Sequence, residues 1–559
     1  MRHSRLHLGH EPAELRLSRR SLLLASGAGM LAVASPAMAG AQTEDQSRVY
    51  VGHSARLTSR IPIAWSANLD GYAGEDGFIS TATVSAGSLD EACSQVILEW
   101  GVSPAPAITR TTWQGQPVCR FQTGDSDNPD VTCVLAHPHP FDSPDGHQTH
   151  VAISADAAHI DGIMQSLDFD PSLVTPDLYV QSALDWMQAN SLFTASIDWE
   201  GLRLWSSEQA QAVRDIPDAY PVMQNAIDVL RSVGDRHSQF ISYSENEALA
   251  TEPTPGFGFE LSRDHVVTVF PESAAGKAGV QPGDQLLTVN GAPFDPQIGE
   301  SQYAGETNAT FSFIRYADGT SYTVTLVATV FSSYLAPTGR LIEPDVGYLH
   351  IPRCRYDLPT WKQYVADGAD VLHGLNRDTT TSWIVDLRGN TGGSFHPMVT
   401  ALAPLITEGP IIGFQDNSGA TDFVSLAGQR LENAGLDAYE LGPERPYVLR
   451  NAAPPVAILI DENVVSSGEL TGMAFAQQPA TRFVGSLTAG YTSSNNALLL
   501  FDGSLLVLAT TWMTDRTGTP YPDGIYPDDE VYSDAETFML DTDPVIQVAL
   551  DWLRAPLQG

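Results

Sequence analysis

A regular alternation of short apolar segments and helical patterns over residues 345–535 constrains the fold more than any other feature of this sequence. The apolar segments at 346–351, 383–387 and 455–460 are predicted to be strands, and the stretches between them to be helices. Strands that alternate with helices are typical of an α/β layer. A closing helix is expected over residues 544–553.

Other parts of the chain have different patterns. Residues 46–165 show short alternating runs at 78–84, 118–122 and 131–136, separated by Gly, Asp, Asn and Pro, which indicates a β-rich N-terminal domain. From 177 to 250 the apolar period becomes helical, and residues 255–335 are rich in strands with tight turns. We therefore predict a multidomain α+β protein, with a core over 340–535 and a C-terminal helix within 536–559.

The charge of the chain is strongly acidic. The 29 Lys and Arg against 67 Asp and Glu give a net charge of −38. Such a chain repels phosphate backbones and anionic lipid, so neither nucleic acid nor a charged membrane surface is expected as a partner. Only two of the basic residues are lysines, Lys277 and Lys362, which limits any mechanism that needs a catalytic lysine.

Residues 1–39 have the features of a cleavable export signal. A basic segment contains the pair Arg19-Arg20 in a twin-arginine pattern, an apolar stretch follows over 21–35, and Ala37-Met38-Ala39 forms a small-x-small cleavage site. The apolar stretch is too short to span a bilayer comfortably, and no later run is long enough. We expect a mature protein without membrane insertion, in a bacterial periplasm or secreted.

The cysteines would then face an oxidising compartment. Because Cys119 and Cys133 flank a turn rich in Gly, Asp and Asn, we expect a local disulfide between them, with Cys93 and Cys354 as the other two cysteines. A nearby histidine group is interpreted as a solvated loop rather than a metal site, because Pro and Asp interrupt it. Its members are His137, His139, His147 and His150.

Residues 256–291 carry several motifs in a fixed order. Gly256-Phe257-Gly258-Phe259 precedes a Ser-Ala-Ala-Gly-Lys-Ala-Gly-Val run at 273–280, Pro-Gly-Asp at 282–284 and Val-Asn-Gly at 289–291. In this order they resemble a bacterial PDZ domain. A Gly-x-Gly-Phe turn presents backbone N–H groups that can bind the C-terminal carboxylate of a peptide while the peptide adds a strand to the sheet. A domain that only packs and binds no peptide is the alternative.

A second series of motifs follows behind this region. It comprises Gly-Tyr-Leu-His-Ile-Pro at 347–352, Asp-Leu-Arg-Gly-Asn-Thr-Gly-Gly at 386–393, Val-Ser-Ser-Gly-Glu at 465–469, Gly-Ser-Leu-Thr-Ala-Gly at 485–490 and Gly-Ile-Tyr-Pro-Asp at 524–528. The series resembles the C-terminal-processing and tricorn-type serine peptidase family over roughly residues 177–531. The resemblance implies an α/β, crotonase-like peptidase core.

Ser466 lies between a predicted strand and a predicted helix. At such a junction the helix dipole favours developing negative charge. Ser466-Ser467-Gly468-Glu469 is equally a capping box, in which Ser466 would only cap the helix. The resemblance implies that Ser466 is the nucleophile.

A serine nucleophile needs a base. The processing branch of the family has a lysine directly after the Gly-x-x-Thr-x-Gly stretch, but Tyr491 stands there, and neither lysine fits the pattern. The tricorn-like branch uses a histidine ahead of the PDZ position, which implies His237. His396, beside the Gly-Gly turn, is the main rival, while His350 lies in a predicted strand.

The oxyanion-binding groups should be backbone N–H groups. The resemblance implies Ser467 and a glycine of the Thr391-Gly392-Gly393 turn, either Gly392 or Gly393, whereas a plain strand-ending turn is the alternative. A group that orients the histidine is also expected. Its candidates are Ser238, Asp523 and Asp528. The tricorn branch has a serine before the histidine, where this chain has Arg236, which leaves the full catalytic set open.

These features together predict an exported serine endopeptidase that acts on polypeptides, with Gly256, Phe257, Gly258 and Phe259 engaging substrate C-termini. Its mechanism would need no metal and no cofactor. Two alternatives remain open at this point. The chain could be an inactive protein of the same fold that binds peptides or small molecules, or an esterase that uses the same nucleophile.

Overall fold

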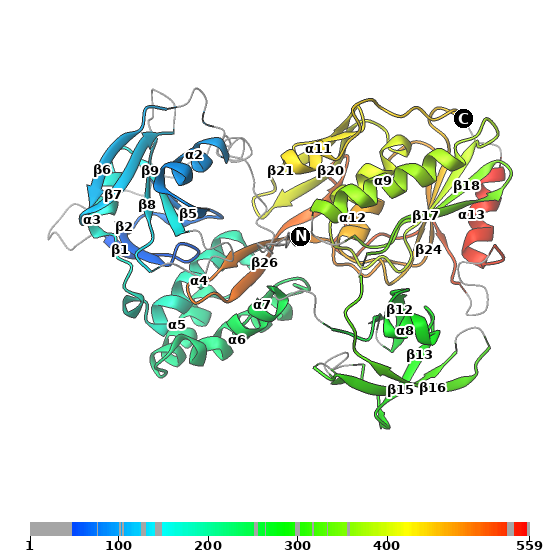
Figure 1. Cartoon of the computed structure of the whole chain (residues 1–559), viewed down its shortest axis with the longest axis horizontal. Helices are drawn as coiled ribbons and strands as arrows, with labels where there is room; N and C mark the ends of the chain where they lie inside the picture. The colour runs from blue at the N-terminus through cyan, green and yellow to red at the C-terminus, as the bar shows by residue number, and fades with distance from the viewer. Residues whose placement is uncertain are drawn as a thin grey trace, which may run out of the picture. The chain divides into compact units, whose positions relative to one another are not determined.

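The computed structural model describes residues 47–74, 77–99, 102, 106–123, 130–139, 148–250, 255–262, 264–296, 302–303, 305–315, 318–332, 334–354, 358–533 and 541–555. The chain divides into two compact units (Figure 1). The first contains the chain up to residue 250 together with 495–511, and the second contains 251–494 and the chain from 512 onward. The predicted export signal lies outside the described residues. None of the described helices has the length and apolar character needed to cross a membrane.

A seven-stranded antiparallel sheet in the order β3-β4-β5-β9-β8-β7-β6 forms the N-terminal part of the first unit. Helix α2 packs on one face through Ala92 and Val96, and helix α3 packs on the other through Ile160 and Ile163. The elements are β1 (Ser47–Gly52), β2 (Leu57–Pro62), β3 (Ser66–Ala67), β4 (Gly71–Gly74), β5 (Gly77–Ala86), α2 (Leu89–Glu99), β6 (Thr109–Trp113), β7 (Gln116–Gln122), β8 (Asp130–Ala136), β9 (Gln148–Asp156) and α3 (Ile160–Ser166). The strands predicted at 78–84, 118–122 and 131–136 are present as β5, β7 and β8.

The disulfide joins Cys93 of α2 to Cys119 of β7, so the predicted Cys119–Cys133 bond is wrong. Cys119 is opposite Val134 in the register of β7 and β8, whereas Cys133 is opposite Arg120. Because neighbouring positions of a strand face opposite sides of a sheet, Cys119 and Cys133 point away from each other. Cys119 therefore meets the helix on its own face, and Cys133 stays reduced and buried on the other.

His137 follows β8 and is buried rather than solvated, which corrects the expectation for that segment. Its ring packs against Phe169 at a centroid distance of 4.6 Å, and its Nδ1 accepts a hydrogen bond from the backbone N–H of His139 at 3.0 Å. His137 is therefore packed in the core, whereas Pro138 and His139 are exposed. His147 lies outside the described residues.

Four helices complete the first unit: α4 (Pro176–Asn190), α5 (Trp199–Gln211), α6 (Tyr220–Ser232) and α7 (Tyr243–Ala250). Helix α4 begins where Thr175 Oγ1 accepts a hydrogen bond from the N–H of Leu178 and Pro176 takes the first position. Helix α5 begins at Asp198, which caps it through the N–H of Gly201. The apolar faces of α4, α5 and α6 form one core.

A hairpin from the C-terminal half of the chain belongs to the same core. Its strands are β25 (Ser493–Leu499) and β26 (Leu505–Asp515), and residues 495–511 cluster with the first unit. Leu500, Phe501, Leu506 and Leu508 are buried among the helices. The first residues of β26 pair with the short strand β10 (Gln239–Ile241). The hairpin thus fills a hydrophobic space that the helices alone leave open.

The second unit begins with a small antiparallel sheet in the order β11-β12-β13-β15-β16. Its core is aromatic and includes Phe257, Phe259, Phe311 and Phe313. Its elements are β11 (Phe259–Ser262), β12 (His265–Val269), α8 (Ala274–Ala278), β13 (Gln285–Val289), β14 (Ala292–Pro293), β15 (Asn308–Ile314) and β16 (Ser321–Val327).

A six-stranded sheet in the order β17-β18-β19-β23-β24-β27 follows in the second unit, with parallel pairing from β18 to β27. The strands predicted at 346–351, 383–387 and 455–460 are present in it. The strands are β17 (Thr338–Glu343), β18 (Val346–His350), β19 (Ser382–Asp386), β23 (Val456–Ile460), β24 (Thr481–Gly485) and β27 (Asp529–Glu530). The helices are α9 (Leu358–Leu375), α10 (Phe395–Leu402), α12 (Ser467–Met473) and α13 (Pro544–Arg554).

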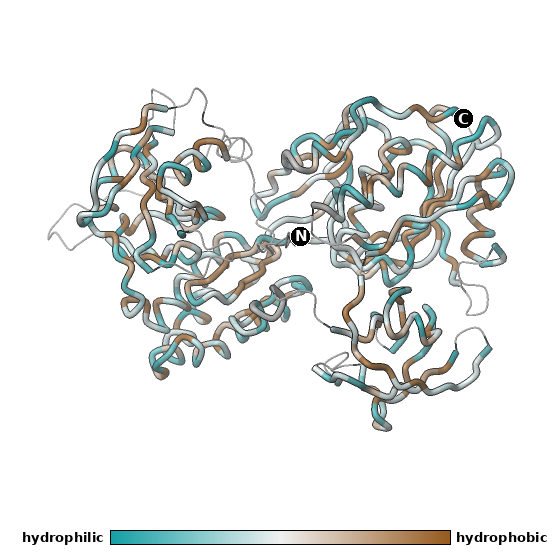
Figure 2. The backbone as a smooth tube through the Cα atoms, viewed as in Figure 1, coloured by the Kyte–Doolittle hydropathy of each residue, from teal (hydrophilic) through white to brown (hydrophobic). Residues whose placement is uncertain are grey.

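Helices cover both faces of this sheet (Figure 1). Alternate residues of β19 and β23 belong to two different cores, one shared with α9, α10 and α12 and the other shared with α13. Both strands are therefore buried on each side, which explains the consecutive apolar residues at 383–385 in β19 and 456–460 in β23. Helix α13 has one buried face and shows both brown and teal residues in Figure 2.

The second unit also contains β20 (Gly409–Asp416), β21 (Thr421–Ala427), β22 (Arg430–Glu432) and α11 (Leu436–Glu440), with the three strands paired antiparallel. Antiparallel sheets, a parallel sheet and segregated helices together confirm the predicted multidomain α+β class.

Candidate active site

Ser466 lies in the turn between β23 and α12, where the sequence predicts a nucleophile. It is the residue directly before the helix, it is half-buried, and its backbone has φ 53° and ψ −118°. A residue with a Cβ atom rarely adopts such a conformation, which costs on the order of 1–3 kcal/mol and persists only where the surrounding structure imposes it. The turn therefore holds the serine in a strained position at the start of a helix.

Glu469, in the first turn of α12, is fully buried and holds the backbone of Ser466. One carboxylate oxygen accepts hydrogen bonds from the N–H groups of Ser466 and Tyr491, each at 2.9 Å. The other accepts from the N–H of Gly490 at 2.8 Å and the hydroxyl of Thr488 at 2.5 Å. Burial raises the pKa of Glu469, and these hydrogen bonds oppose the rise. The carboxylate thus ties the serine turn to the 488–491 segment.

The glycine turn after β19 packs directly on the serine turn. A Cβ atom on Gly392 would lie 2.8 Å from the carbonyl oxygen of Val465 and 3.1 Å from the nitrogen of Ser467, so only glycine allows this approach. Asn390, which is buried, accepts the N–H of Gly392 on its side-chain oxygen at 2.9 Å and the N–H of Val465 on its carbonyl oxygen at 3.0 Å. The structure therefore brings Gly392 and Ser466 together.

Two N–H groups at this junction remain available to a ligand. Among the residues that the structure describes, the N–H groups of Ser467 and Gly393 donate no hydrogen bond to the protein. The N–H of Gly392, in contrast, is used by Asn390. Since Ser467 is the first residue of α12, its N–H carries the positive end of the helix dipole.

A buried ionic network lies beneath the glycine turn. The guanidinium of Arg388, 2% exposed, pairs with Asp386 and Asp543 at 2.6 Å each, and both carboxylates are fully buried. Burial alone would raise the pKa of Asp386, but Arg388 outweighs it and holds the pKa below the ordinary value. Asp543 also caps α13 through the N–H of Val545. The network joins the Asp-Leu-Arg-Gly motif to the C-terminal helix.

His237 lies in the first unit, in the turn between α6 and β10, and is half-buried. The buried carboxylate of Asp235 accepts the backbone N–H groups of His237 and Ser238, each at 2.9 Å, and the hydroxyl of Ser238 at 2.5 Å. The Ser238 oxygen accepts the N–H of Ala509 in β26 at 2.9 Å. Asp235 organises this turn. The sequence interpretation missed it, although carboxylates that bond N–H groups two and three residues ahead are a common turn signal.

The other predicted site residues occupy varied places. The ring of His396 lies near Phe395 and Trp361, and burial lowers its pKa to about 4. Burial also lowers the pKa of His350 at the end of β18. The Asp528 carboxylate accepts the N–H of Phe483 in the middle of β24 at 2.8 Å, and Asp523 is exposed.

Both lysines are exposed, Lys277 on α8 and Lys362 on α9. Lys277 Nζ donates to the carbonyl oxygen of Glu272 at 2.6 Å. Neither lysine lies in the serine turn, the glycine turn or the 488–491 segment.

In the Gly-Phe-Gly-Phe segment the two aromatic side chains are core residues. The N–H of Gly256 donates to Thr329 at 3.0 Å. Within the described residues, the N–H groups of Phe257 and Gly258 donate to no protein acceptor.

A hollow of about 710 Å³ adjoins the serine turn. It is formed by the residues just before Ser466, the 486–491 segment that Glu469 holds, and one tyrosine near β27. The described lining residues are Glu462, Val465, Ser486, Leu487, Thr488, Ala489, Tyr491 and Tyr532.

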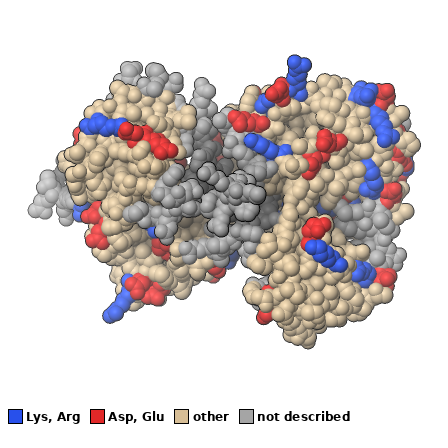
Figure 3. Space-filling model, in the orientation of Figure 1, with Lys and Arg blue, Asp and Glu red and all other residues tan. Residues whose placement is uncertain are grey.

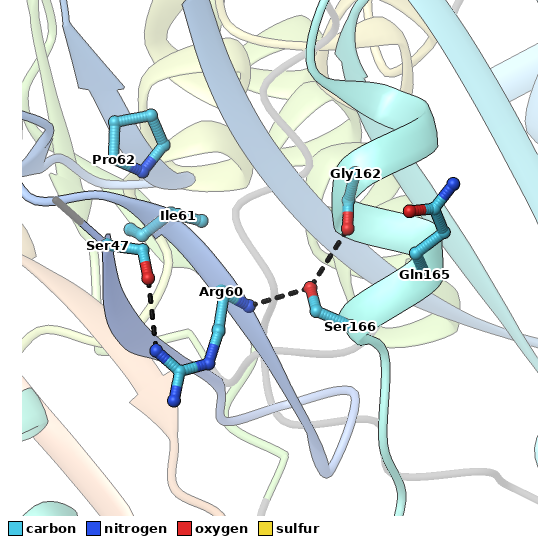
Figure 4. Close-up of a pocket in the computed structure, with 7 residues that line it drawn as sticks. All are labelled: Ser47, Arg60, Ile61, Pro62, Gly162, Gln165 and Ser166. Atoms are coloured by element: carbon cyan, nitrogen blue, oxygen red, sulfur yellow. Dashed lines mark hydrogen bonds between the residues drawn. The ribbon is translucent and has the colours of Figure 1, made fainter. Parts of the chain in front are cut away.

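Another hollow, of about 550 Å³, lies in the first unit beside β2 and α3 (Figure 4). Its polar groups bond one another: Arg60 donates its guanidinium to Ser47 at 3.0 Å and its backbone N–H to Ser166 at 3.0 Å, and Ser166 donates to Gly162. The described lining residues are Ser47, Arg60, Ile61, Pro62, Gly162, Gln165 and Ser166.

Comparison with known proteins places the candidate site within a matched region. Residues 345–531 match the family model described as peptidase family S41. The nisin-resistance protein of Lactococcus lactis subsp. lactis is 34% identical over 195 residues, which are 34% of this chain and 56% of that protein. The carboxyl-terminal-processing protease of Synechocystis sp. is 21% identical over 361 residues, which are 61% of this chain and 78% of that protein. The first of these matches spans little more than half of the relative's length.

Among solved structures, the photosystem II D1 C-terminal processing protease has a TM-score of 0.48 and 18% sequence identity, covering 65% of this chain and 94% of that one. The tricorn protease has a TM-score of 0.35 and 13% identity, covering 86% of this chain and 45% of that one.

Proposed function

We propose, from the match of residues 345–531 to peptidase family S41, that the chain is an exported serine-type endopeptidase that cleaves polypeptides with Ser466 as nucleophile. The relatives named as carboxyl-terminal-processing proteases support a polypeptide substrate. Ser466 Oγ attacks the scissile carbonyl carbon, the C–N bond then breaks to leave an acyl-enzyme, and water hydrolyses this ester.

The observation that carries the proposal is the junction of two turns. A strained serine at the start of α12 packs against the glycine turn, where two N–H groups have no protein acceptor among the described residues. Such donors stabilise the negative charge that develops on the carbonyl oxygen in the transition state. We assign this role to Ser467 and Gly393 rather than to Gly392, because the N–H of Gly392 is bonded to Asn390.

His237 is the proposed general base, which takes the proton of Ser466 and returns it to the leaving amine. Three observations favour it over its rivals. Both lysines are exposed on other helices, Tyr491 stands at the lysine position of the processing branch, and His396 has a pKa near 4 that makes it a weak base. Asp235 holds the backbone on both sides of the His237 side chain. We therefore place Asp235, ahead of Asp523 and Asp528, among the residues that position the histidine.

Two further parts of the proposal concern substrate capture and location. The N–H groups of Phe257 and Gly258 are candidates to bind a substrate C-terminus at the small sheet, with the Phe257 and Phe259 side chains supporting the turn from the core. Export through the twin-arginine signal at 1–39 places the enzyme in a periplasm or outside the cell, and the Cys93–Cys119 disulfide is consistent with an oxidising compartment.

The test is covalent labelling of the mature protein by a fluorophosphonate probe over roughly pH 5–9, a range that brackets an imidazole titration. Labelling is expected to rise through about pH 6–7 and to disappear in Ser466→Ala and His237→Ala. Ser244→Ala and His265→Ala, both exposed, serve as matched controls that keep the labelling.

A folded protein that is not labelled at any pH would contradict the proposal and leave a binding protein of the same fold. Labelling with turnover of short esters but not of unfolded proteins would indicate an esterase. Loss of labelling in Ser466→Ala but not in His237→Ala would reassign the base.

A further inference from the structure

We propose that the hollow beside Ser466 binds the side chain of a basic substrate residue, with Glu462 as the residue that selects it. This inference rests on the proposed peptidase function and names the substrate class: polypeptides with lysine or arginine next to the scissile bond. The contacts, the charge and the shape of the hollow each support it.

The first support is the position of the hollow. Val465 in its wall immediately precedes Ser466. Thr488 and Tyr491, also in the wall, bond the same Glu469 carboxylate that holds the Ser466 backbone. The N–H of Ala489 donates to the carbonyl oxygen of Val464 at 3.0 Å. The hollow and the serine turn are thus one hydrogen-bonded unit, so a side chain close to the reacting carbonyl reaches it.

The second support is charge. Glu462 is exposed in the wall, and one of its oxygens accepts the hydroxyl of Ser486 at 3.0 Å. Its other oxygen accepts no hydrogen bond from the described residues. The described wall contains no Lys, Arg or His. Asp461 lies next to Glu462, and Tyr532 donates its hydroxyl to Glu530 at 2.7 Å, so two further carboxylates stand close by.

The state of Asp461 agrees with a concentration of negative charge. Burial raises its pKa to about 6, and the Glu462 carboxylate adds to the rise. Above that pH the Asp461 carboxylate is ionised, next to the Glu462 side chain. A cation entering the hollow would then be attracted by both, whereas an acidic substrate side chain would be repelled.

The third support is shape. Tyr491 and Tyr532 contribute aromatic rings to the wall, and Tyr532 is 64% exposed. Lysine and arginine pack their methylene stems along such surfaces, keep the charged group at a polar end, and interact favourably with the faces of the rings. An apolar substrate side chain would gain the ring contacts but would desolvate the second Glu462 oxygen without giving it a hydrogen-bond donor.

The charge of the whole protein favours the same class of substrate. On the face drawn in Figure 3, basic side chains lie beside acidic ones. Ion pairs of the chain include Arg450–Asp378 and Arg110–Asp90. In total the chain has 67 acidic residues against 29 basic ones. This excess of negative charge gives an electrostatic potential that attracts cationic polypeptides and raises their association rate.

The experiment compares peptides that differ at one position. Cleavage sites are first located by mass spectrometry in denatured proteins, and peptides around one site then carry lysine, norleucine or glutamate at each flanking position. At one position the native enzyme is expected to prefer lysine over norleucine by about tenfold in kcat/KM, within the range of single-contact discrimination. Glu462→Gln should reduce that ratio to about 1–2, and Glu462→Lys should favour glutamate instead.

Glu440→Gln, which removes the same charge from an exposed site on α11, is the matched control and keeps the lysine preference. Fluorophosphonate labelling distinguishes a failure of the lysine preference from a failure of the proposed peptidase function. If the enzyme and the Glu462 variants are labelled equally but lysine is not preferred, or if Glu462→Gln keeps the preference, the inference is overturned while the peptidase function stands. If a folded native enzyme is neither labelled nor active on any peptide, the proposed function fails and the inference with it.

Discussion

The turns that carry Ser466 and His237 are both held by a buried carboxylate, but the two carboxylates work over different distances. Asp235 accepts N–H groups two and three residues ahead in its own turn. Glu469 accepts one N–H from Ser466 and three further hydrogen bonds from residues 488–491, a separate part of the chain. The carboxylate of the His237 turn therefore acts within its own turn, whereas the carboxylate of the Ser466 turn depends on a distant part of the chain.

The backbone conformations differ in the same sense. In the His237 turn the positive φ, 108°, falls on Gly234, which adopts it without strain. In the Ser466 turn it falls on the serine, at 53°. A glycine there would be easier to fold but would lack a hydroxyl. Backbone strain is therefore tolerated at a position where a side chain is needed, and long-range hydrogen bonds maintain the strained conformation.

The largest effect is expected from Glu469→Gln. An amide cannot accept at both ends, so at least one buried N–H of the four donors loses its acceptor, which costs about 2–3 kcal/mol in the free energy of unfolding. We also expect the rate of fluorophosphonate labelling to fall at least about tenfold, because the Ser466 backbone loses its anchor. Urea unfolding and labelling measure the two effects. Unchanged stability, with the exposed Glu440→Gln as control, would show that the Ser466 turn is held locally after all.

A smaller effect is expected from Asp235→Ala. Three donors lose their acceptor, but the turn is partly open to solvent, so the free energy of unfolding should fall by about 2 kcal/mol. Labelling should slow because the His237 backbone is no longer fixed. Asp235→Asn keeps an acceptor oxygen and should recover most of the stability. The surface variant Asp228→Ala is expected to stay within about 0.5 kcal/mol of the parent. Equal losses in Asp235→Asn and Asp235→Ala would contradict a role through the backbone N–H groups.

The smallest effect concerns the strain itself. Neither Ser466→Gly nor Ser466→Ala can be labelled, but glycine accepts a positive φ and alanine does not. We expect the glycine variant to be more stable than the alanine variant by about 1 kcal/mol, the reverse of the order usual at an ordinary position. Thermal unfolding of the two variants measures the difference. A less stable glycine variant would mean that the turn imposes no strain on Ser466.

The sequence predicted the parts of the structure that depend on local patterns. Strands with consecutive apolar residues, such as β19 and β23, the helices α4 and α13, and the start of α12 after Ser466 follow from hydrophobic period and from motifs a few residues long. The glycine turn and Ser466 were linked only by resemblance to a family. Their packing, with Gly392 against Val465, depends on neighbouring parallel strands ending at the same edge of a sheet.

The missed features depend on which distant residues meet. Cys133 was preferred over Cys93 because it flanks the same turn as Cys119, but the one-residue offset in register places it on the opposite face of the sheet. The assignment of Gly393 rather than Gly392 as donor to the oxyanion depends on the hydrogen bond from the N–H of Gly392 to Asn390. The spacing of residues in the sequence does not reveal that bond. Asp235 lay within a stretch already singled out, and its turn signal could have been recognised.

The hairpin of β25 and β26 has a consequence for biosynthesis. Leu500, Phe501, Leu506 and Leu508 complete a helical core whose other residues lie between 51 and 230. At translation rates of about 5–20 residues per second, synthesis of residues 251–494 takes on the order of 10–50 seconds, during which the helices have emerged without their hairpin. The apolar faces of α4 and α6 stay uncovered on the ribosome for that interval, so the nascent chain requires protection there until its C-terminal half has been made.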